Sequence, residues 1–355
     1  MAVGKVQSSA EPDLASSTMI TALPDGGAAS REEVLLIGSA GNLMSIITRP
    51  ATARTRAAEA VRAAPAPSAA VELRSDAGVN PGTEGVRAGA EGAQPPTVIF
   101  LNAGVIHRVG PHRLHVTLAR ELAAGGSTAI RVDLSGIGDS RPLSGDLSFR
   151  QRSVSDARAT MDEATAAGAA PRFVLFGLCS GADNAVATAL ADDRVVGVVL
   201  VDPFTYPTLP SVARKVAVMV RRLGGPRRVV LWGAGIVARR ARGQMEAIKR
   251  RVKQGGRPAE AEEEPAQNGR EVPPKDVFGA QLGALERRGV KILALYSGTH
   301  GDRYNHPDQV FEMFPHLRGK IERQYYPDVN HTFTELAAQR RLRATVTDWV
   351  NRQFR

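Results

Sequence analysis

The stretch Phe173-Val174-Leu175-Phe176-Gly177-Leu178-Cys179-Ser180-Gly181-Ala182 decides how this chain folds. An apolar run that is typical of a short strand leads into Gly177-x-Cys179-x-Gly181, and small residues typical of a helix follow. At such a junction the central residue takes a strained backbone conformation, and the positions two before and two after it must be small, because strand and helix approach closely. Gly177 and Gly181 meet that demand, so we predict that Cys179 is a nucleophile.

Two other interpretations of this stretch stay open. If Ser180 were the nucleophile, its flanking positions would be Leu178 and Ala182, and a leucine would clash at the position of close approach. The register therefore favours Cys179. The alternative is a buried structural cysteine, because free cysteine is among the most buried residue types.

Composition limits the class of protein. The 355 residues, 43% of them hydrophobic, suffice for one large domain with an insertion or for two domains. A single cysteine excludes an internal disulfide framework and a cysteine metal cluster, and we expect no metal and no cofactor. We see no secretory signal in the first thirty residues and no run near the roughly 18 apolar residues of a membrane span, so we expect a cytoplasmic protein.

The charge balance points to an anionic partner. The formal net charge is +10, which favours acidic lipids, acidic proteins, nucleic acid or carboxylated substrates. Only 5% of the residues are aromatic and none interleave with the basic runs, so we expect no nucleic-acid partner.

Strands alternate with helices along the chain, which predicts an α/β fold with a mostly parallel central sheet flanked by helices. A helical cap interrupts this alternation. The predicted parts are a disordered segment over 1–30, a first core part over 31–202 with a flexible insertion at 51–95, a basic cap over 203–289 and a second core part over 290–355.

The cap carries most of the excess charge. Ser211 to Leu223 has the pattern of an amphipathic basic helix, and between Ser211 and Arg257 fourteen lysines and arginines accompany a single acid, Glu246. We expect the cap to shape an acyl pocket and to bind an anionic membrane surface or an acidic carrier protein.

A histidine and a carboxylate complete the predicted chemistry. His331 lies between the last predicted strand and the last helix, from where it could reach Cys179 and accept its proton or stand beside a thiolate as imidazolium. Asp302, after the predicted strand 291–296, is our choice for the acid that orients His331. Asp308 and Asp202 remain alternatives for that role.

An oxyanion hole needs two backbone donors. We expect one from the N–H of Ser180, at a helix N-terminus, and the other from the N–H of Val105, in a loop where Gly104 gives the backbone freedom. We also expect Gly104, His107 and Arg108 to contact the substrate, the latter two through an anionic group. The alternative for His107 and Arg108 is ordinary helix-cap and surface charge.

These motifs resemble the α/β-hydrolase superfamily over 31–50, 97–202 and 290–355. The resemblance rests on Gly177–Gly181, on Asp133–Ser140 and on Asp328–Phe333. Asn102–Leu114 together with the cysteine box looks like the hydrolases associated with bacterial exosortase and exopolysaccharide loci. A cysteine in this box is also similar to dienelactone hydrolases and polyhydroxyalkanoate synthases. The resemblance implies an α/β-hydrolase fold with a cap, whereas the long insertion and the basic cap depart from the simple pattern.

The expected function is acyl transfer through a thioester on Cys179. The substrate would be a small acyl compound, free or carrier-bound, and the reaction would be hydrolysis of an ester, lactone or thioester. The alternatives are an acyltransferase that passes the acyl group to an alcohol or amine, and an inactive hydrolase fold used for binding. The sequence leaves the acyl group, the acceptor and the oligomeric state open.

Overall fold

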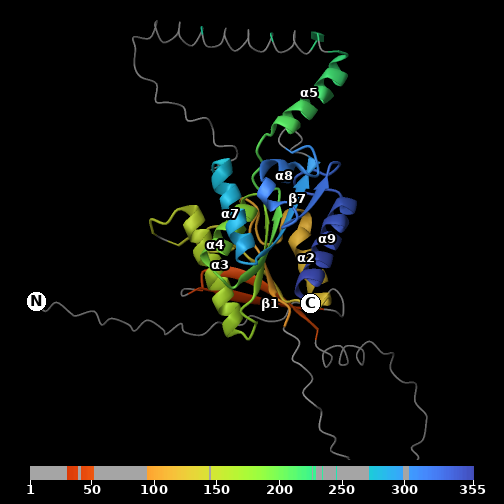
Figure 1. Ribbon diagram of the computed structural model, residues 1–355. Coiled ribbons are helices and arrows are strands. Elements are labelled where there is room, and N and C mark those ends of the chain that lie inside the picture. The colour runs from red at the N-terminus through yellow and green to blue at the C-terminus, as the bar shows by residue number, and fades with distance from the viewer. Residues whose placement is uncertain are drawn as a thin grey trace, which may run out of the picture.

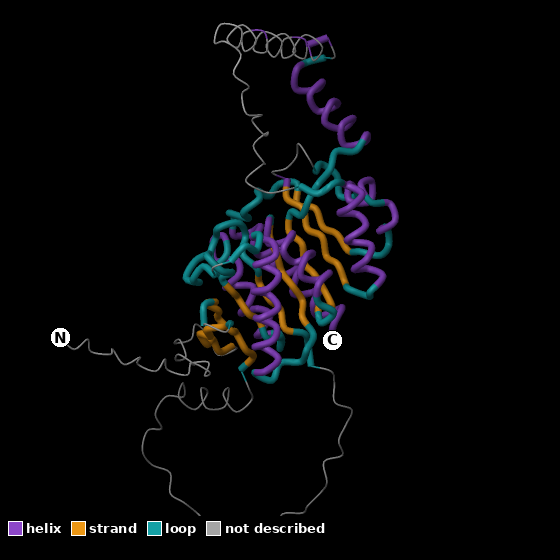
Figure 2. The backbone as a smooth tube through the Cα atoms, turned by 90° about the vertical axis from the view of Figure 1, so that its left-hand side faces the viewer, coloured by secondary structure: helices purple, strands orange, loops and turns teal. Residues whose placement is uncertain are grey.

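The computed structural model describes residues 30–38, 41–51, 94–143, 145–225, 227, 228, 234, 245, 272–298 and 304–355. Within this part of the chain a single sheet runs through the molecule with helices on both of its faces (Figures 1 and 2). The strands are β1 (Ser30–Ile37), β2 (Leu43–Pro50), β3 (Thr97–Phe100), β4 (Ala129–Val132), β5 (Phe173–Leu178), β6 (Val195–Val201), β7 (Lys291–Ser297) and β8 (Glu322–Tyr326). The α-helices are α2 (Leu114–Ala124), α3 (Phe149–Ala166), α4 (Ser180–Ala191), α5 (Leu209–Leu223), α7 (Lys275–Arg287), α8 (Gln309–Met313) and α9 (Leu336–Phe354), and short 3-10 turns cover Pro111–Arg113 and Pro315–Leu317.

The sheet has eight strands in the order β1-β2-β4-β3-β5-β6-β7-β8. Strand β2 is antiparallel to both of its neighbours, and all other pairs are parallel. The mostly parallel sheet is therefore confirmed. Because β5 and β6 are adjacent and parallel, the residues that follow them lie at one edge of the sheet. Cys179 and Asp202 are those residues.

Each face of the sheet packs against its own helices. Successive side chains of β5 point to opposite faces, so Phe173 and Leu175 join one core cluster while Val174 and Phe176 join the other. Apolar residues of α3, α4 and α7 complete the first cluster, and those of α2 and α9 complete the second. The continuous apolar strands of the sequence follow from this double covering.

Helix α7 lies inside the predicted cap region 203–289 but belongs to the core. Its side chains Phe278, Leu282 and Leu285 are buried in the same cluster as β6 and β7. The helix carries two glycines, and a Cβ on Gly279 would lie 2.8 Å from the ring of Phe314. These glycines permit close packing, and they also weaken the helical pattern of this stretch in the sequence.

Helix α5 is the second α-helix of the predicted cap region that the structure describes in full, and it projects from the body of the molecule (Figure 1). It begins after Thr208, whose side chain accepts a hydrogen bond from the backbone of Ser211, and it ends at Gly224 in a left-handed conformation. Residues 1–29, 52–93 and nearly all of 229–271 lie outside the described residues, and they include most of the predicted disordered segment 1–30, most of the predicted insertion 51–95 and half of the predicted cap 203–289. Among the described helices, none is long and apolar enough to cross a membrane.

Candidate active site

Cys179 occupies the turn between β5 and α4 with φ 58° and ψ −121°. This is a strained conformation for a residue with a side chain. The flanking glycines make it sterically accessible: a Cβ on Gly177 would overlap the backbone of Gly181, and a Cβ on Gly181 would lie 2.7 Å from the carbonyl oxygen of Asn102. The spacing of small residues that the sequence shows is thus a requirement of the turn.

His331 lies in the loop between β8 and α9 and contacts two groups. Its Nδ1 is 2.6 Å from the Oδ2 atom of Asp202, and its side chain also hydrogen-bonds Cys179. Burial disfavours the imidazolium, but the hydrogen bonds and the charges of Asp202 and Cys179 outweigh that effect and raise the pKa of His331 to about 9. The arrangement therefore favours a protonated His331 at neutral pH.

Asp202 is itself held firmly. Its side chain is 3% exposed, its Oδ1 accepts from the backbone N–H of Ser297 at 2.7 Å, and its Oδ2 accepts from the Ser297 hydroxyl at 2.7 Å. Its backbone has φ 48°. The end of β7 thus orients the carboxylate that follows β6.

The carboxylate beside His331 is that of Asp202, which the sequence analysis gave as an alternative to Asp302. Asp302, the first choice, lies outside the described residues. Asp308 forms an ion pair with Arg323 at 2.6 Å. The signal for Asp202 in the sequence is its place directly after the apolar run of β6, and it keeps the predicted chain order of Cys179, a carboxylate and His331.

The loop after β3 reaches the N-terminus of α4 through Gly104. The backbone N–H of Gly104 donates to the Ser180 hydroxyl at 2.8 Å, which places this amide beside the residue after Cys179. Val105, the predicted loop donor, has an 89% exposed side chain at the tip of the same loop. The geometry thus brings Gly104 and Ser180 together.

A buried carboxylate supports this loop. Asp133 accepts hydrogen bonds from the side chain of Asn102 and from both the backbone and the guanidinium of Arg108. The Arg108 guanidinium also pairs with Asp139 at 2.6 Å. Arg108, which was predicted to bind an anionic substrate group, forms ion pairs with these two carboxylates and positions the loop. His107, in the same loop, is exposed.

The loop that carries His331, between β8 and α9, is held by contacts that the sequence did not reveal. Asn330 donates to the Thr334 hydroxyl at 2.8 Å and accepts from the Thr334 backbone at 3.0 Å, while His112 lies 3.3 Å from the same hydroxyl. The motif around His331 carried a signal for Asn330, but nothing in the sequence linked His112 to it. Among the described residues, no three or more His, Cys, Asp or Glu side chains gather as metal ligands.

Three features now define the architecture: the strand order with β2 antiparallel, the strained turn after β5, and the chain order of Cys179, Asp202 and His331. The chain has the α/β-hydrolase fold. Residues 95–251, less than half of the chain, match the family model described as serine aminopeptidase, S33. The matched residues include Cys179.

The comparison with solved structures finds matches at low identity. A puromycin-hydrolysing peptidase from Mycobacterium tuberculosis is 16% identical with a TM-score of 0.49, and the match covers 94% of this chain but 40% of that one. A protein from Klebsiella pneumoniae subsp. pneumoniae MGH 78578 that is assigned as a dienelactone hydrolase is 14% identical to this chain, with a TM-score of 0.48. The match covers 92% of this chain and 100% of that one. No curated protein sequence matches this chain.

Proposed function

We propose that this protein is an acyl-transfer enzyme that forms a thioester on Cys179 and hydrolyses an ester, lactone or thioester. The observation that carries the proposal is the contact of Cys179, at a strained strand–helix turn, with His331, whose Nδ1 is held by Asp202. A nucleophile, a base and an orienting carboxylate in this order are the parts of covalent acyl transfer.

In the acylation step the Cys179 thiolate attacks the substrate carbonyl carbon, and the carbonyl π electrons move onto the oxygen. When the tetrahedral intermediate collapses, the bond to the leaving alcohol or thiol breaks, and His331 donates its proton to that leaving group. Asp202 stabilises the imidazolium and keeps one ring nitrogen toward Cys179. An imidazolium with a pKa of about 9 is charged at neutral pH and can serve as this acid.

In the second step the neutral His331 accepts a proton from water as its oxygen attacks the thioester. The carbon–sulfur bond then breaks, the carboxylic acid leaves as product, and the thiolate and imidazolium return. With an alcohol or amine in place of water, the same step would be acyl transfer to that acceptor.

We assign the two oxyanion donors to the backbone N–H groups of Ser180 and Gly104. Ser180 begins α4, where N–H groups point out of the helix end. The N–H of Gly104 already donates to an oxygen, the Ser180 hydroxyl, beside the nucleophile. An oxyanion would replace that hydroxyl as acceptor, so Gly104 is better placed for this role than Val105.

A thiolate suits substrates with good leaving groups, which favours thioesters, activated esters and lactones over amides. The substrate would therefore be a small acyl compound, free or carried as a thioester. The buried and oriented Asp202 supports an enzyme over an inactive binding protein, because a fold used only for binding has no need of a carboxylate on His331.

The test is steady-state turnover on a panel of acyl thioesters and p-nitrophenyl esters, with and without an added alcohol or amine. We expect Cys179→Ala to lower kcat/KM at least about 10³-fold, while Ser180→Ala, the matched neighbour, keeps its backbone donor and most of the activity. The proposal would be wrong if Cys179→Ala retained turnover while Ser180→Ala lost it. The ratio of acid to transferred product distinguishes hydrolase from acyltransferase.

A further inference from the structure

Helix α5 has two chemically different faces. Residues two apart in a helix lie about 200° apart, so Val216 and Val218 point to nearly opposite sides. The side of Val216 is an aliphatic stripe made of Leu209, Val212, Val216, Met219, Val220 and Leu223. The other side carries the cationic residues Arg214, Lys215, Arg221 and Arg222, and the helix contains no acidic residue.

The aliphatic stripe is exposed over its first half and half-buried at Met219, Val220 and Leu223. Leu209 is 89% exposed, Val212 is 47% exposed and Val216 is 45% exposed. Single exposed aliphatic residues are ordinary, but a continuous row of them on one helix face marks an interaction surface.

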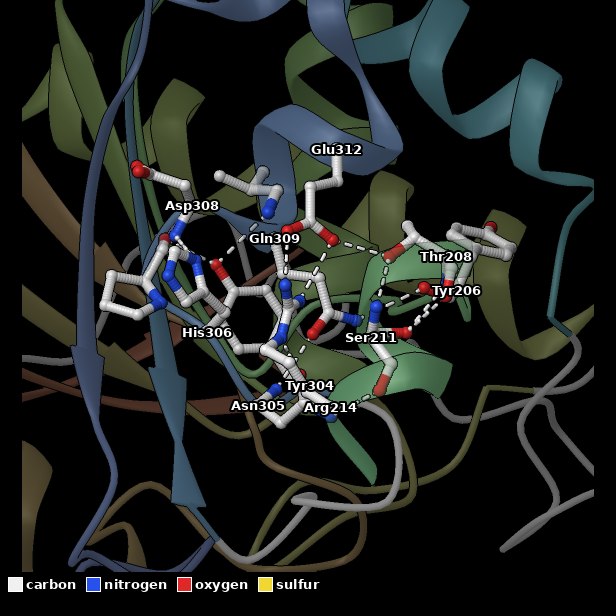
Figure 3. A network of polar contacts seen from close by, with 12 residues as sticks. Tyr206, Thr208, Ser211, Arg214, Tyr304, Asn305, His306, Asp308, Gln309 and Glu312 are labelled. Carbon is white, nitrogen blue, oxygen red and sulfur yellow. Dashed lines mark hydrogen bonds and ion pairs between the residues drawn. The ribbon is translucent and has the colours of Figure 1, made fainter. Parts of the chain in front are cut away.

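The body holds α5 by its polar face. Arg214 forms an ion pair with Glu312 of α8 at 2.8 Å and donates to Asn305 at 2.9 Å, and the Thr208 hydroxyl donates to Glu312 (Figure 3). Asn305 also donates to the backbone oxygen of Ser211. These contacts fix the first turn through its polar side, and the rest of the helix projects from the body (Figure 1).

We infer that α5 lies on the surface of an anionic lipid bilayer, with its aliphatic stripe in the headgroup–acyl boundary and its arginines among the lipid phosphates and carboxylates. A helix with an apolar stripe, a basic opposite face and too little hydrophobicity to span is the form that binds in the interface plane. The inference goes beyond the proposed function and does not depend on it.

Charge complementarity favours an anionic surface. Arg221 and Arg222 are exposed at the end of α5, and Arg227 and Arg228 are exposed just after it. The stretch 211–257 contains fourteen Lys and Arg residues and one acid. An acidic carrier protein would account for these arginines, but it would leave the aliphatic stripe without a role, whereas a bilayer uses both faces.

Docking would also orient the molecule. Helix α5 starts shortly after Asp202, at the edge of the sheet that carries Cys179. A bilayer beneath α5 would therefore lie near the edge of the sheet that carries Cys179 and Asp202.

The experiment is co-sedimentation of the full chain with vesicles of phosphatidylcholine alone and of phosphatidylcholine mixed with phosphatidylserine. We expect binding to the mixed vesicles only, weakened by salt. Val216→Asp should weaken it at least about tenfold, whereas Val218→Asp, with the same charge change in the same helix and a 48% exposed side chain, should weaken it far less. Arg221→Glu with Arg222→Glu should abolish binding, whereas Arg150→Glu with Arg340→Glu, an equal charge change on α3 and α9, should not.

Equal losses for the two valine variants, or for the two arginine pairs, would overturn the inference. The inference would also be wrong if Arg221→Glu with Arg222→Glu lost vesicle binding while Val216→Asp kept it. That result would indicate a purely ionic partner such as an acidic carrier. Cys179→Ala should bind vesicles like the unaltered protein, so failure of the proposed chemistry and failure of docking give different results.

Discussion

At the scale of single residues, the charge of His331 depends on the two side chains that it contacts, Asp202 and Cys179. His331 is partly buried, which alone would keep it neutral, and its raised pKa comes from Asp202 on one side and Cys179 on the other. A thiolate beside an imidazolium is the reactive form of cysteine. In the proposed mechanism, the proton of the imidazolium stabilises the Cys179 thiolate and is then given to the leaving group.

The first prediction concerns pH. Because acylation needs protonated His331, kcat/KM should fall as pH rises through about 9, where the imidazolium loses its proton. Asp202→Asn removes a charge that raises this pKa, so the falling limb should move to lower pH and activity should drop by about 10² to 10⁴-fold. The measurement is a pH profile of thioester hydrolysis for both proteins. A limb that stays in place in the variant would contradict the role of Asp202.

A second prediction concerns Ser297, which is fully buried and donates to Asp202. Ser297→Ala should lower kcat by about tenfold with little change in KM, because it loosens the carboxylate without touching substrate. Ser297→Thr keeps a hydroxyl and should restore part of the rate if the pocket accepts the added methyl group. An effect on KM alone would indicate that Ser297 shapes the substrate pocket instead.

At the scale of elements, the turn after β5 is determined by backbone proximity. A methyl group on Gly177 would overlap the backbone of Gly181, which cannot move without separating β5 from α4. Gly177→Ala should therefore lower the free energy of unfolding by about 3 kcal/mol or more. Urea unfolding measures this. Gly283→Ala in α7 is the control, since its nearest atoms are the ends of Arg287 and His316 side chains at 3.3 Å, and it should be close to neutral.

Elements with strong local patterns could be predicted from the sequence. Strand β6 (Val195–Val201) contains an unbroken apolar run that is typical of a buried parallel strand, and the strained turn at Cys179 is predicted by the glycines on either side of it. Helix α7 was not predicted, because its glycines and the acidic, Pro-rich stretch before it hide a pattern that only tertiary packing against Phe314 explains.

The carboxylate that contacts His331 was harder to predict than the strained turn at Cys179. Sequence order allows any aspartate between Cys179 and His331, and Asp302, Asp308 and Asp202 all remained candidates. What distinguishes Asp202 is the pairing of β5 with β6 and the two donors of Ser297, and both are long-range contacts. The role of Gly104 likewise depends on a contact with Ser180, 76 positions away.

At the scale of the whole molecule, a cluster of charged side chains around Glu32 connects the first strand, β1, to β4 and α2. Glu32 of β1 pairs with Arg131 of β4 and with Arg120 of α2, each at 2.8 Å. Arg131 is 2% exposed, and burial, partly offset by Glu32, lowers its pKa to about 10. Strands β1 and β2 are thus held to the body by charge as well as by the backbone ladder.

The fourth prediction tests this cluster. Glu32→Gln leaves the charge of Arg131 buried without its carboxylate and should cost about 3 kcal/mol of stability. Glu33→Gln is the matched control one position along the same strand, because Glu33 pairs with the more exposed Arg31 and Arg49 and should cost less than about 1 kcal/mol. Urea unfolding of the two variants compares them. Equal losses would show that the buried cluster contributes no more than a surface pair.

The central claim is that Cys179 carries the acyl group. The most direct measurement is the intact mass of the protein after brief exposure to an acyl thioester, followed by peptide mapping of any adduct, with Cys179→Ala and His331→Ala alongside. We expect one acyl group on the peptide that contains Cys179, slower acylation in His331→Ala, and none in Cys179→Ala. An adduct that persists in Cys179→Ala and maps to Ser180 would contradict the account. So would turnover of the substrate without any acyl group on Cys179.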